Sequence, residues 1–202
     1  MRKAKDFKKE RDIFAESKGV LKTTEAIKRG IHPRRLYLMA ESGYIQKLAR
    51  GLYRLSGMPQ LSNPDLITIC LKVPKGVVSL ISSLAFHNLT TQIPHEVYIA
   101  LPKGARQPAI SYPPARFFRF YGKAFAEGIE THEIDGISIR VYSPEKSLAD
   151  CFKFRNVLGM DTVLEALRNY LKRKNRELNT LIHYAEICRV YRIMRPYIES
   201  AI

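Results

Sequence analysis

Apolar residues recur at three- and four-residue spacing in the first part of the chain, which is the pattern of short amphipathic helices. Phe7 and Phe14 belong to such a pattern over residues 6–18. A second helix is expected to begin at the threonine pair 23–24, where a hydroxyl can accept from the orphan N–H groups of the first turn, and to end at Gly30. The N-terminal segment is therefore predicted to contain two short helices in succession.

A third helix is predicted to run from Pro33 to the residue before Gly43. Proline suits the first helical position because its missing N–H has no partner to lose there. Leu36, Met39 and Ala40 share one face by their spacing. This face is expected to pack inward, while the arginines at the start of the helix point away from it.

Two short extended segments follow the third helix, at Tyr44–Leu48 and Leu52–Ser56. The residues between them include Gly51, and a glycine-containing loop of this length is typical of a β-hairpin. Helix, helix, tight turn, helix and hairpin is the element order of a winged helix-turn-helix. We therefore predict a winged helix-turn-helix domain over residues 1–58, followed by a turn-rich linker.

The remaining residues, 64–202, are predicted to form a second domain. Its clearest strand signal is the alternation on both sides of Asp135-Gly136, a pair typical of a two-residue hairpin turn. Ser143-Pro144-Glu145 combines a cap, a first-position proline and an acidic first turn, and so predicts the start of a helix. The expected fold class is α+β: an N-terminal winged helix-turn-helix plus a C-terminal domain of a small, mostly antiparallel sheet with a helical tail.

Charge is unevenly spread along the 202 residues. The chain has 34 basic and 19 acidic residues, a formal net charge of +15, and the first 60 residues contribute +9 of it. A concentrated positive field attracts polyanions. The apolar content of 46% excludes a disordered chain. Without a long apolar run or an apolar stretch behind the basic N-terminus, and with three widely spaced cysteines, we expect a cytoplasmic protein that does not bind membranes.

The basic residues of the first domain are the candidates for contact with DNA. In a winged helix-turn-helix the third helix enters the major groove and its N-terminal residues contact base edges. Arg34 and Arg35 lie there, and arginine can bind guanine through two hydrogen bonds. For the other positions, phosphate contact and an ordinary solvated surface both explain the pattern. The candidate DNA-binding residues are Lys22, Thr23, Thr24, Lys28, Arg34, Arg35, Tyr37, Arg50 and Arg54.

Two further basic groups occur in the second domain. Residues 103–123 interleave basic and aromatic side chains with no acidic residue. This pattern suits stacking on single-stranded nucleic acid, but we prefer the interpretation as a strand with core aromatics and exposed arginines. The second group lies at a helix end, where the helix dipole alone favours positive charge. The candidate second polyanion surface consists of Arg116, Arg119, Arg168, Lys172 and Arg173.

The sequence contains no convincing catalytic or metal-binding set. His87, His95, His132 and His183 lack metal-ligand spacing, and there is no Gly-rich phosphate loop. The pair Asp150-Cys151 has no identifiable histidine partner that would make the thiol a nucleophile. We therefore expect a protein that is not an enzyme and that holds no metal and no cofactor.

Several runs of residues, taken together, resemble one protein family. In the first domain these are Gly19–Ile27 and the wing segment Gly51–Leu55. The most specific run is Leu89–Pro102 (LTTQIPHEVYIALP), joined by Ser143–Arg155 (SPEKSLADCFKFR) and by Met194–Tyr197 near the end. In combination they resemble the AbiEi family of antitoxins, from bacterial abortive-infection toxin–antitoxin pairs, over nearly the whole chain.

The resemblance implies a transcriptional autorepressor whose winged helix binds inverted repeats of double-stranded DNA in its own promoter. It also implies that the C-terminal domain acts as an antitoxin, so that the second polyanion surface becomes a candidate antitoxin surface. The implied partner is a nucleotidyltransferase-type toxin in a type IV system, in which the two proteins form no stable complex, and the implied role is phage defence. An RNA-binding module, or a stand-alone regulator without a toxin partner, is the alternative.

Overall fold

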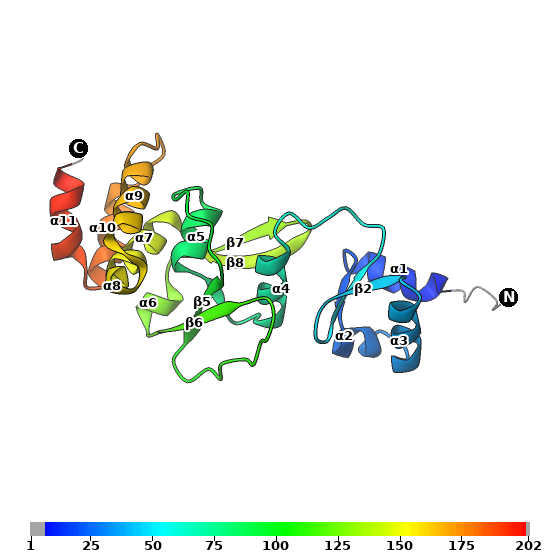
Figure 1. Ribbon diagram of the computed structural model, residues 1–202. Coiled ribbons are helices and arrows are strands. Elements are labelled where there is room, and N and C mark those ends of the chain that lie inside the picture. The colour runs from blue at the N-terminus through cyan, green and yellow to red at the C-terminus, as the bar shows by residue number, and fades with distance from the viewer. Residues whose placement is uncertain (1–6, 201–202) are drawn as a thin grey trace. The chain divides into compact units, whose positions relative to one another are not determined.

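The computed structural model describes residues 7–200 (Figure 1). The chain forms two compact units, which are described separately. One runs up to Thr68 and includes Ile134–Ile137, and the other consists of Ile69–Glu133 and the residues from Ser138 onwards. The division into domains at 1–58 and 64–202 stays a prediction; the change from one unit to the other falls within helix α4 (Pro64–Lys72). Of the helices predicted at the two ends, residue 6 and residues 201–202 lie outside the described residues.

The N-terminal unit has the predicted order of helices and hairpin. Its helices are α1 (Lys8–Glu16), α2 (Thr23–Lys28) and α3 (Pro33–Glu41), and its strands are β1 (Val20–Lys22), β2 (Ile45–Ala49) and β3 (Leu52–Leu55). The strands form a sheet in the order β1-β3-β2, with both pairings antiparallel. The winged helix-turn-helix architecture is thereby confirmed.

One local prediction for this unit is wrong. Strand β1 occupies the residues before α2, and it is too short to show alternation in the sequence. The N-cap of α2 is consequently Lys22 in an extended conformation, and no side chain caps the helix. Thr23 is the first helical residue, and its N–H donates to the carbonyl oxygen of Gly51 in the wing turn at 2.9 Å. The expected threonine cap is therefore replaced by a backbone contact.

The core of the N-terminal unit lies between its helices and its sheet. Leu36 and Met39 of α3 are buried as predicted, and Ala40 is half-buried. Ile31 fills the turn between α2 and α3. The buried residues of this core are Phe7, Phe14, Leu21, Ala26, Ile31, Leu36, Met39 and Ile45. They come from all three helices and from the sheet, so the exposed face of α3 is held from behind by a packed core.

The C-terminal unit contains a five-stranded sheet with helices packed against it. Its strands are β4 (Val77–Val78), β5 (Val97–Pro102), β6 (Ala115–Phe120), β7 (Ile129–Ile134) and β8 (Ile137–Tyr142), in the order β6-β5-β4-β8-β7. Its helices after α4 are α5 (Leu80–Phe86), α6 (Lys123–Ala126), α7 (Pro144–Lys153), α8 (Arg155–Leu158), α9 (Met160–Leu171), α10 (Leu178–Ile187) and α11 (Tyr191–Glu199).

The α+β class is confirmed, but the sheet is mixed rather than mostly antiparallel. Strand β4 pairs antiparallel with β5 and parallel with β8, while β5 and β6 pair in parallel. The neighbours β7 and β8 are joined by two residues, a connection that only antiparallel strands allow. The β5–β6 connection spans residues 103–114, which is long enough to return the chain for a parallel pairing.

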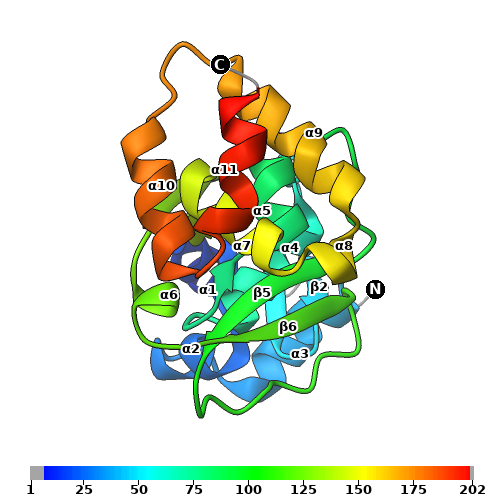
Figure 2. The same cartoon turned by 90° about the vertical axis from the view of Figure 1, so that its left-hand side faces the viewer.

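The helical tail is confirmed, and its helices contribute to an extensive buried core of the C-terminal unit. Figure 2 shows α9, α10 and α11 gathered on one side of strands β5 and β6. Together with α5 and α7 they bury Leu84, Phe152, Leu167 and Met194, among others. None of the described helices combines the length and apolarity required to span a bilayer.

Candidate nucleic-acid interface

Helix α3 is held in place by its first turn. Gly30 takes a φ of +92° between α2 and α3, a left-handed conformation that glycine adopts without strain. His32 is the N-cap, and its Nδ1 accepts a hydrogen bond from the backbone N–H of Arg34 at 3.2 Å. Pro33 occupies the first helical position, as predicted. The start of α3 is therefore fixed by turn geometry, a side-chain cap and a proline.

The outer face of α3 carries the first candidate residues. Arg34 is exposed, and Tyr37, one turn later on the same face, is 65% exposed. Neither is among the core residues, and the first turn of the helix contains no acidic residue that would neutralise Arg34. A guanidinium and a phenol on an open helix face can reach base edges and phosphates without repacking the domain.

Arg35 behaves differently from its neighbour. Its Nη2 donates to Oε2 of Glu10 in α1 at 2.8 Å, and its Nε donates to Oε1 of the same carboxylate. Its guanidinium also lies 5.2 Å from the ring centre of Phe7. Glu10 is only 6% exposed, and the hydrogen bond from Arg35 lowers the pKa of this carboxyl against the effect of burial. The structure thus uses Arg35 to join α3 to α1.

The wing presents one of its two predicted arginines. Arg50 is exposed in the turn between β2 and β3. Arg54 is 9% exposed, and its Nη2 donates to the carbonyl oxygen of Pro59. Lys47, which sequence reasoning missed, is exposed on β2. Ile45 and Lys47 are two residues apart, so strict alternation would place them on the same face of β2. The burial of β2 does not follow that alternation, and its pairing with β3 is irregular between Lys47 and Ala49, so no strand periodicity in the sequence could have found Lys47.

The α2 candidates divide by exposure. Thr24 and Lys28 are exposed, while Lys22 and Thr23 are half-buried at the junction of β1 and α2. Arg29, next to Lys28, is paired with Glu25 one turn earlier at 3.0 Å. Because both side chains of this ion pair are exposed, the pair contributes little to stability. Lys28 is not part of the pair. The structure places Thr24 and Lys28 on open surface of the domain that carries the exposed face of α3.

Residues 8–56, which cover this whole set of elements, match the family model described as "Transcriptional regulator, AbiEi antitoxin". The N-terminal domain thus matches the AbiEi family. The match extends from α1 to the end of the wing, so the AbiEi domain coincides with the winged helix-turn-helix built above. Arg34, Tyr37, Lys47 and Arg50 are thus exposed residues of an AbiEi transcriptional-regulator domain.

The fold of the chain is similar to that of a solved structure. The crystal structure of the RV2827C protein from Mycobacterium tuberculosis has a TM-score of 0.54 and 11% sequence identity, covering 97% of this chain and 83% of that one. At this identity the similarity shows the fold alone. No curated protein matches the sequence.

Outside the AbiEi domain, the start of the Leu89–Pro102 run is a loop that is hydrogen-bonded to helix α9. Glu165 of α9 accepts from the hydroxyls of Thr90 and Thr91 and from the N–H of Thr91, each at 2.9 Å. These bonds, led by the Thr91 N–H, lower the pKa of the Glu165 carboxyl. Asn169 of α9 donates to the carbonyl of Leu89 at 3.0 Å. These hydrogen bonds hold the run in place within the C-terminal unit. Ile93, in the same run, is 82% exposed.

The helix that begins at Ser143-Pro144-Glu145 is also mostly buried. The Ser143 side chain accepts from the N–H of Lys146, which confirms the predicted cap of α7. Lys146 and Asp150 are 0% and 1% exposed, and Nζ lies 2.5 Å from Oδ2. Burial raises the pKa of Asp150 to about 6 in spite of Lys146. Burial also raises the pKa of the Cys151 thiol well above its usual range, so this cysteine is an inert core residue.

The candidate second polyanion surface is not one continuous patch. Arg116 and Arg119 are three residues apart on β6 and so lie on opposite faces of the strand. Arg116 faces Glu96, with Nη1 3.6 Å from Oε1. Arg173 is half-buried and donates to the carbonyl of His87. Arg168 and Lys172 are exposed on one face of α9 and its C-cap.

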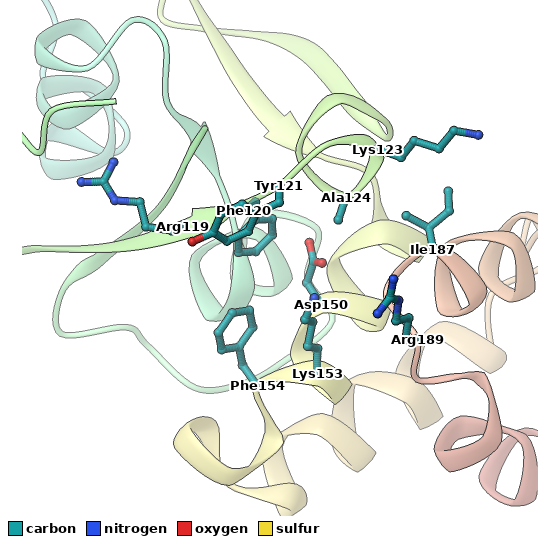
Figure 3. A pocket seen from close by; sticks show the side chains of 10 residues that line it. All are labelled: Arg119, Phe120, Tyr121, Lys123, Ala124, Asp150, Lys153, Phe154, Ile187 and Arg189. Carbon is teal, nitrogen blue, oxygen red and sulfur yellow. The ribbon is translucent and has the colours of Figure 1, made fainter. Parts of the chain in front are cut away.

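A cavity of about 450 Å³ opens beside β6 in the C-terminal unit. Its lining combines apolar and charged side chains, and consists of Arg119, Phe120, Tyr121, Lys123, Ala124, Asp150, Lys153, Phe154, Ile187 and Arg189. In Figure 3 the Asp150 carboxylate lies centrally among the aromatic rings, while the Arg119 side chain extends away from the other side chains. Aromatic rings with several cations at the rim suit a ligand that has both a flat face and negative charge.

Proposed function

We propose that the AbiEi domain binds duplex DNA with α3 in the major groove and Arg34 as its principal base contact. The observation that carries this proposal is the contrast between two adjacent arginines. Arg34 is exposed at the N-terminal end of a firmly capped helix, whereas Arg35 is engaged by Glu10. An arginine in that position can bind guanine O6 and N7 through two hydrogen bonds.

The surrounding exposed residues suit contacts with the DNA backbone. We infer that Thr24, Lys28 and Tyr37 contact phosphates beside the groove, together with Lys22 and Thr23 at the edge of α2. Arg50 and Lys47 extend this contact from the wing. Phosphate contacts of this kind fix the position of a protein on DNA without reading the sequence. Arg35 and Arg54 are left out of the proposed contacts because their guanidinium groups hold the domain together.

The chain is further proposed to repress its own promoter at inverted repeats and to act as an antitoxin. Support for this comes from the match of residues 8–56 to a family of antitoxin regulators and from the resemblance of the later runs to the same family. The proposed counterpart is a nucleotidyltransferase-type toxin in a type IV abortive-infection system. The exposed residues Arg168 and Lys172 and the cavity beside β6 are the proposed antitoxin surfaces.

Selection from a randomised duplex pool tests the DNA-binding proposal. The full chain is expected to retain a repeated motif at ~0.2 M salt, where binding through phosphates alone has weakened steeply. Arg34→Ala is expected to relax the preference at one or two base pairs, and Lys28→Ala to weaken all sequences alike. An Arg34→Ala variant that selects the same motif with the same affinity would show that α3 does not read bases through this residue.

A second candidate function, single-stranded RNA binding by the C-terminal unit, is favoured by the cavity beside β6. Exposed Tyr121 and the cations Lys123, Lys153 and Arg189 could hold a base and its phosphate there. Competition decides between the two functions. If single-stranded RNA displaces a selected DNA duplex, and Lys153→Ala abolishes the RNA binding, then RNA is a ligand in its own right. If RNA competes only at low salt and Lys153→Ala has no effect, the cavity has no such role.

A further inference from the structure

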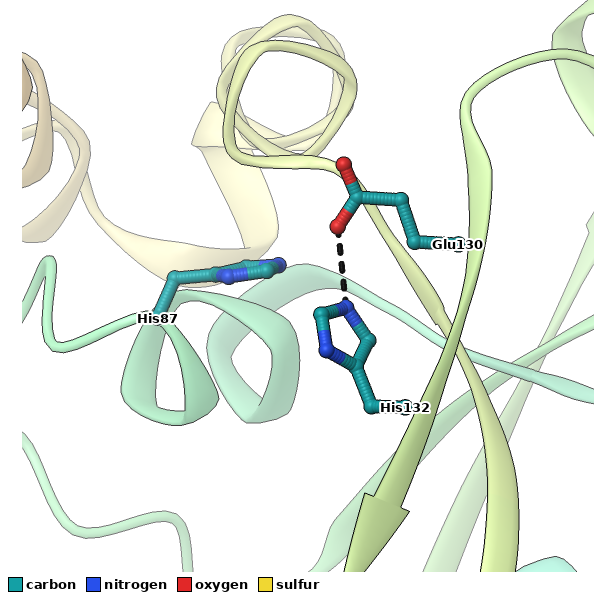
Figure 4. A group of neighbouring side chains, drawn as sticks. All are labelled: His87, Glu130 and His132. Atoms are coloured by element: carbon teal, nitrogen blue, oxygen red, sulfur yellow. Dashed lines mark hydrogen bonds and ion pairs between the residues drawn. The ribbon is translucent and has the colours of Figure 1, made fainter. Parts of the chain in front are cut away.

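Two histidines and a glutamate that are distant in sequence converge in the C-terminal unit. His87 is the C-cap residue of α5, while Glu130 and His132 lie on β7. One ligand atom from each of the three residues lies within 4.8 Å of the others. Figure 4 shows His87 approaching from the helix side and the other two side chains from the strand side. We propose that these three residues form a binding site for a divalent transition metal ion of the zinc type.

The strand geometry explains why two of the ligands coincide. Glu130 and His132 are two residues apart on β7, so their side chains stand on the same face of the strand. Oε2 of Glu130 and Nε2 of His132 are 2.9 Å apart and share a hydrogen bond. A metal ion would take the place of the proton between these two atoms: the neutral imidazole of His132 then carries its single proton on Nδ1 and offers the Nε2 lone pair to the ion, beside the Glu130 carboxylate. The pair is therefore already aligned before an ion binds.

The third ligand is held in place independently. Nε2 of His87 lies 2.7 Å from the carbonyl oxygen of Tyr142. An ion can bind at Nδ1 while this bond persists, or replace the bond at Nε2. Carbonyl partners of this kind orient the histidines of metal sites. Phe86 packs edge-on against both histidines, with ring centres 5.1 Å from His87 and 4.9 Å from His132. Both rings are therefore positioned by neighbours outside the three-residue set.

The distances and the donor set suit zinc. With ligand atoms about 2 Å from a tetrahedral ion, any two of them lie about 3.3 Å apart. A separation of up to 4.8 Å closes to this value by small side-chain rotations. Two imidazoles and one carboxylate are nitrogen and oxygen ligands that zinc accepts, and three protein ligands leave one position for water or another ligand. A hard ion such as magnesium would prefer an all-oxygen set.

Zinc titration of the metal-free full chain tests the proposal, with a chromophoric chelator as competitor. The expected result is one competing site per chain, weakened at least tenfold in His132→Gln and in Glu130→Gln. His183→Gln is the matched control, because His183 pairs with Glu127 at 3.1 Å in the same manner but belongs to no three-residue set among residues 7–200. Zinc is also expected to raise the melting temperature of the parent chain and of His183→Gln, but not of His132→Gln.

Cobalt supplies a second readout that separates this site from the cysteines. Cobalt bound by His87, Glu130 and His132 should give visible d–d bands without the near-ultraviolet band of a thiolate ligand. A thiolate band, unchanged zinc affinity in both ligand variants, or no zinc binding by the parent chain would each overturn the proposal. Melting in the presence of a chelator shows whether the variants are folded. A folded His132→Gln chain that still binds zinc with the original affinity is decisive against the site.

Discussion

Exchanging Arg35 for alanine should damage the fold of the AbiEi domain rather than its sequence preference. The substitution removes both hydrogen bonds to Glu10, whose side chain is 8% exposed, and the contact with the Phe7 ring. Leaving a buried charged group without its partner costs about 1–3 kcal/mol or more. Because the Arg35 side chain is 42% exposed, water can partly replace it, which places the expected loss at the lower end of this range.

The expected loss is therefore about 1.5 kcal/mol of unfolding free energy, including ~0.5 kcal/mol from the ring contact. For a domain of this size such a loss lowers the melting temperature by roughly 6–12 °C. Hydrogen exchange of the α1 and α3 amides in the full chain reports on this unit separately from the C-terminal unit. Protection of both helices should fall in Arg35→Ala and remain unchanged in Arg34→Ala, because the Arg34 side chain is exposed.

A double-mutant cycle with Glu10→Gln isolates the ion pair. The cost of Glu10→Gln should be smaller in the Arg35→Ala background than in the parent chain, with a coupling energy of about 1 kcal/mol. The pH dependence has a defined sign. The pKa of Glu10 is lowered in the folded state, so its contribution is complete above the ordinary glutamate pKa and is lost as the pH falls through the folded pKa. Arg35→Ala should abolish this acid-side loss.

Fluorescence anisotropy with a selected duplex and a scrambled duplex completes the comparison. Arg34→Ala should lose about 1–3 kcal/mol of discrimination between the two duplexes, the amount expected for one bidentate base contact. Arg35→Ala should keep its discrimination at a temperature where the domain is still folded. The reverse pattern, with Arg35→Ala fully stable but unable to discriminate, would refute the assignment of the two arginines.

Three further predictions follow from the geometry. Lys47→Ala and Arg50→Ala should each weaken binding to all duplexes and reduce the slope of log affinity against log salt by about 0.9, so an unchanged slope removes that residue from the interface. Gly30→Ala meets no steric clash but must adopt a φ of +92°, and thermal melting should show a loss of about 1 kcal/mol or more; an unaltered melting temperature would mean that the turn rearranges. Lys146→Met should cost about 3–5 kcal/mol in urea unfolding because Asp150 is left as an unpaired buried charge, and adding Asp150→Leu should restore most of it, unless the pair stabilises the fold in its own right.

The sequence predicted those elements whose position is set by residues next to one another in the chain. The α3 start at Pro33 follows from residue type and neighbours. Two strands, Ile129–Ile134 and Ile137–Tyr142, lie on either side of Asp135-Gly136, where the alternation predicted them. Strand β4, in contrast, has only two residues, and its place in the centre of the sheet comes entirely from its partners β5 and β8. No periodicity can be read from two residues.

The candidate site was predictable in the same limited sense. The sequence places Arg34 and Arg35 at the start of the same helix and offers no means of separating them. The difference comes from Glu10, twenty-five positions earlier, which contacts Arg35 and not Arg34. The Arg54 guanidinium donates a hydrogen bond to the carbonyl oxygen of Pro59 and is therefore engaged within the domain. The position of that carbonyl depends on the path of the chain after β3. Long-range partners of this kind decide which basic residues are available to a ligand.

The runs that make the sequence resemble an antitoxin are themselves mostly internal. Thr90 and Thr91 bind Glu165, and Lys146 binds Asp150 within the core. Such residues maintain the fold of the C-terminal unit, so a resemblance carried by them indicates shared architecture more directly than a shared binding surface. The residues that could contact a toxin or its target must be exposed. Ile93, in the loop bound to Glu165, is 82% exposed, which is more than any other large apolar side chain among the described residues. The hydrogen bonds of Thr90 and Thr91 to Glu165 therefore hold the loop that exposes Ile93, and substitutions of Ile93 test the antitoxin role without removing those bonds.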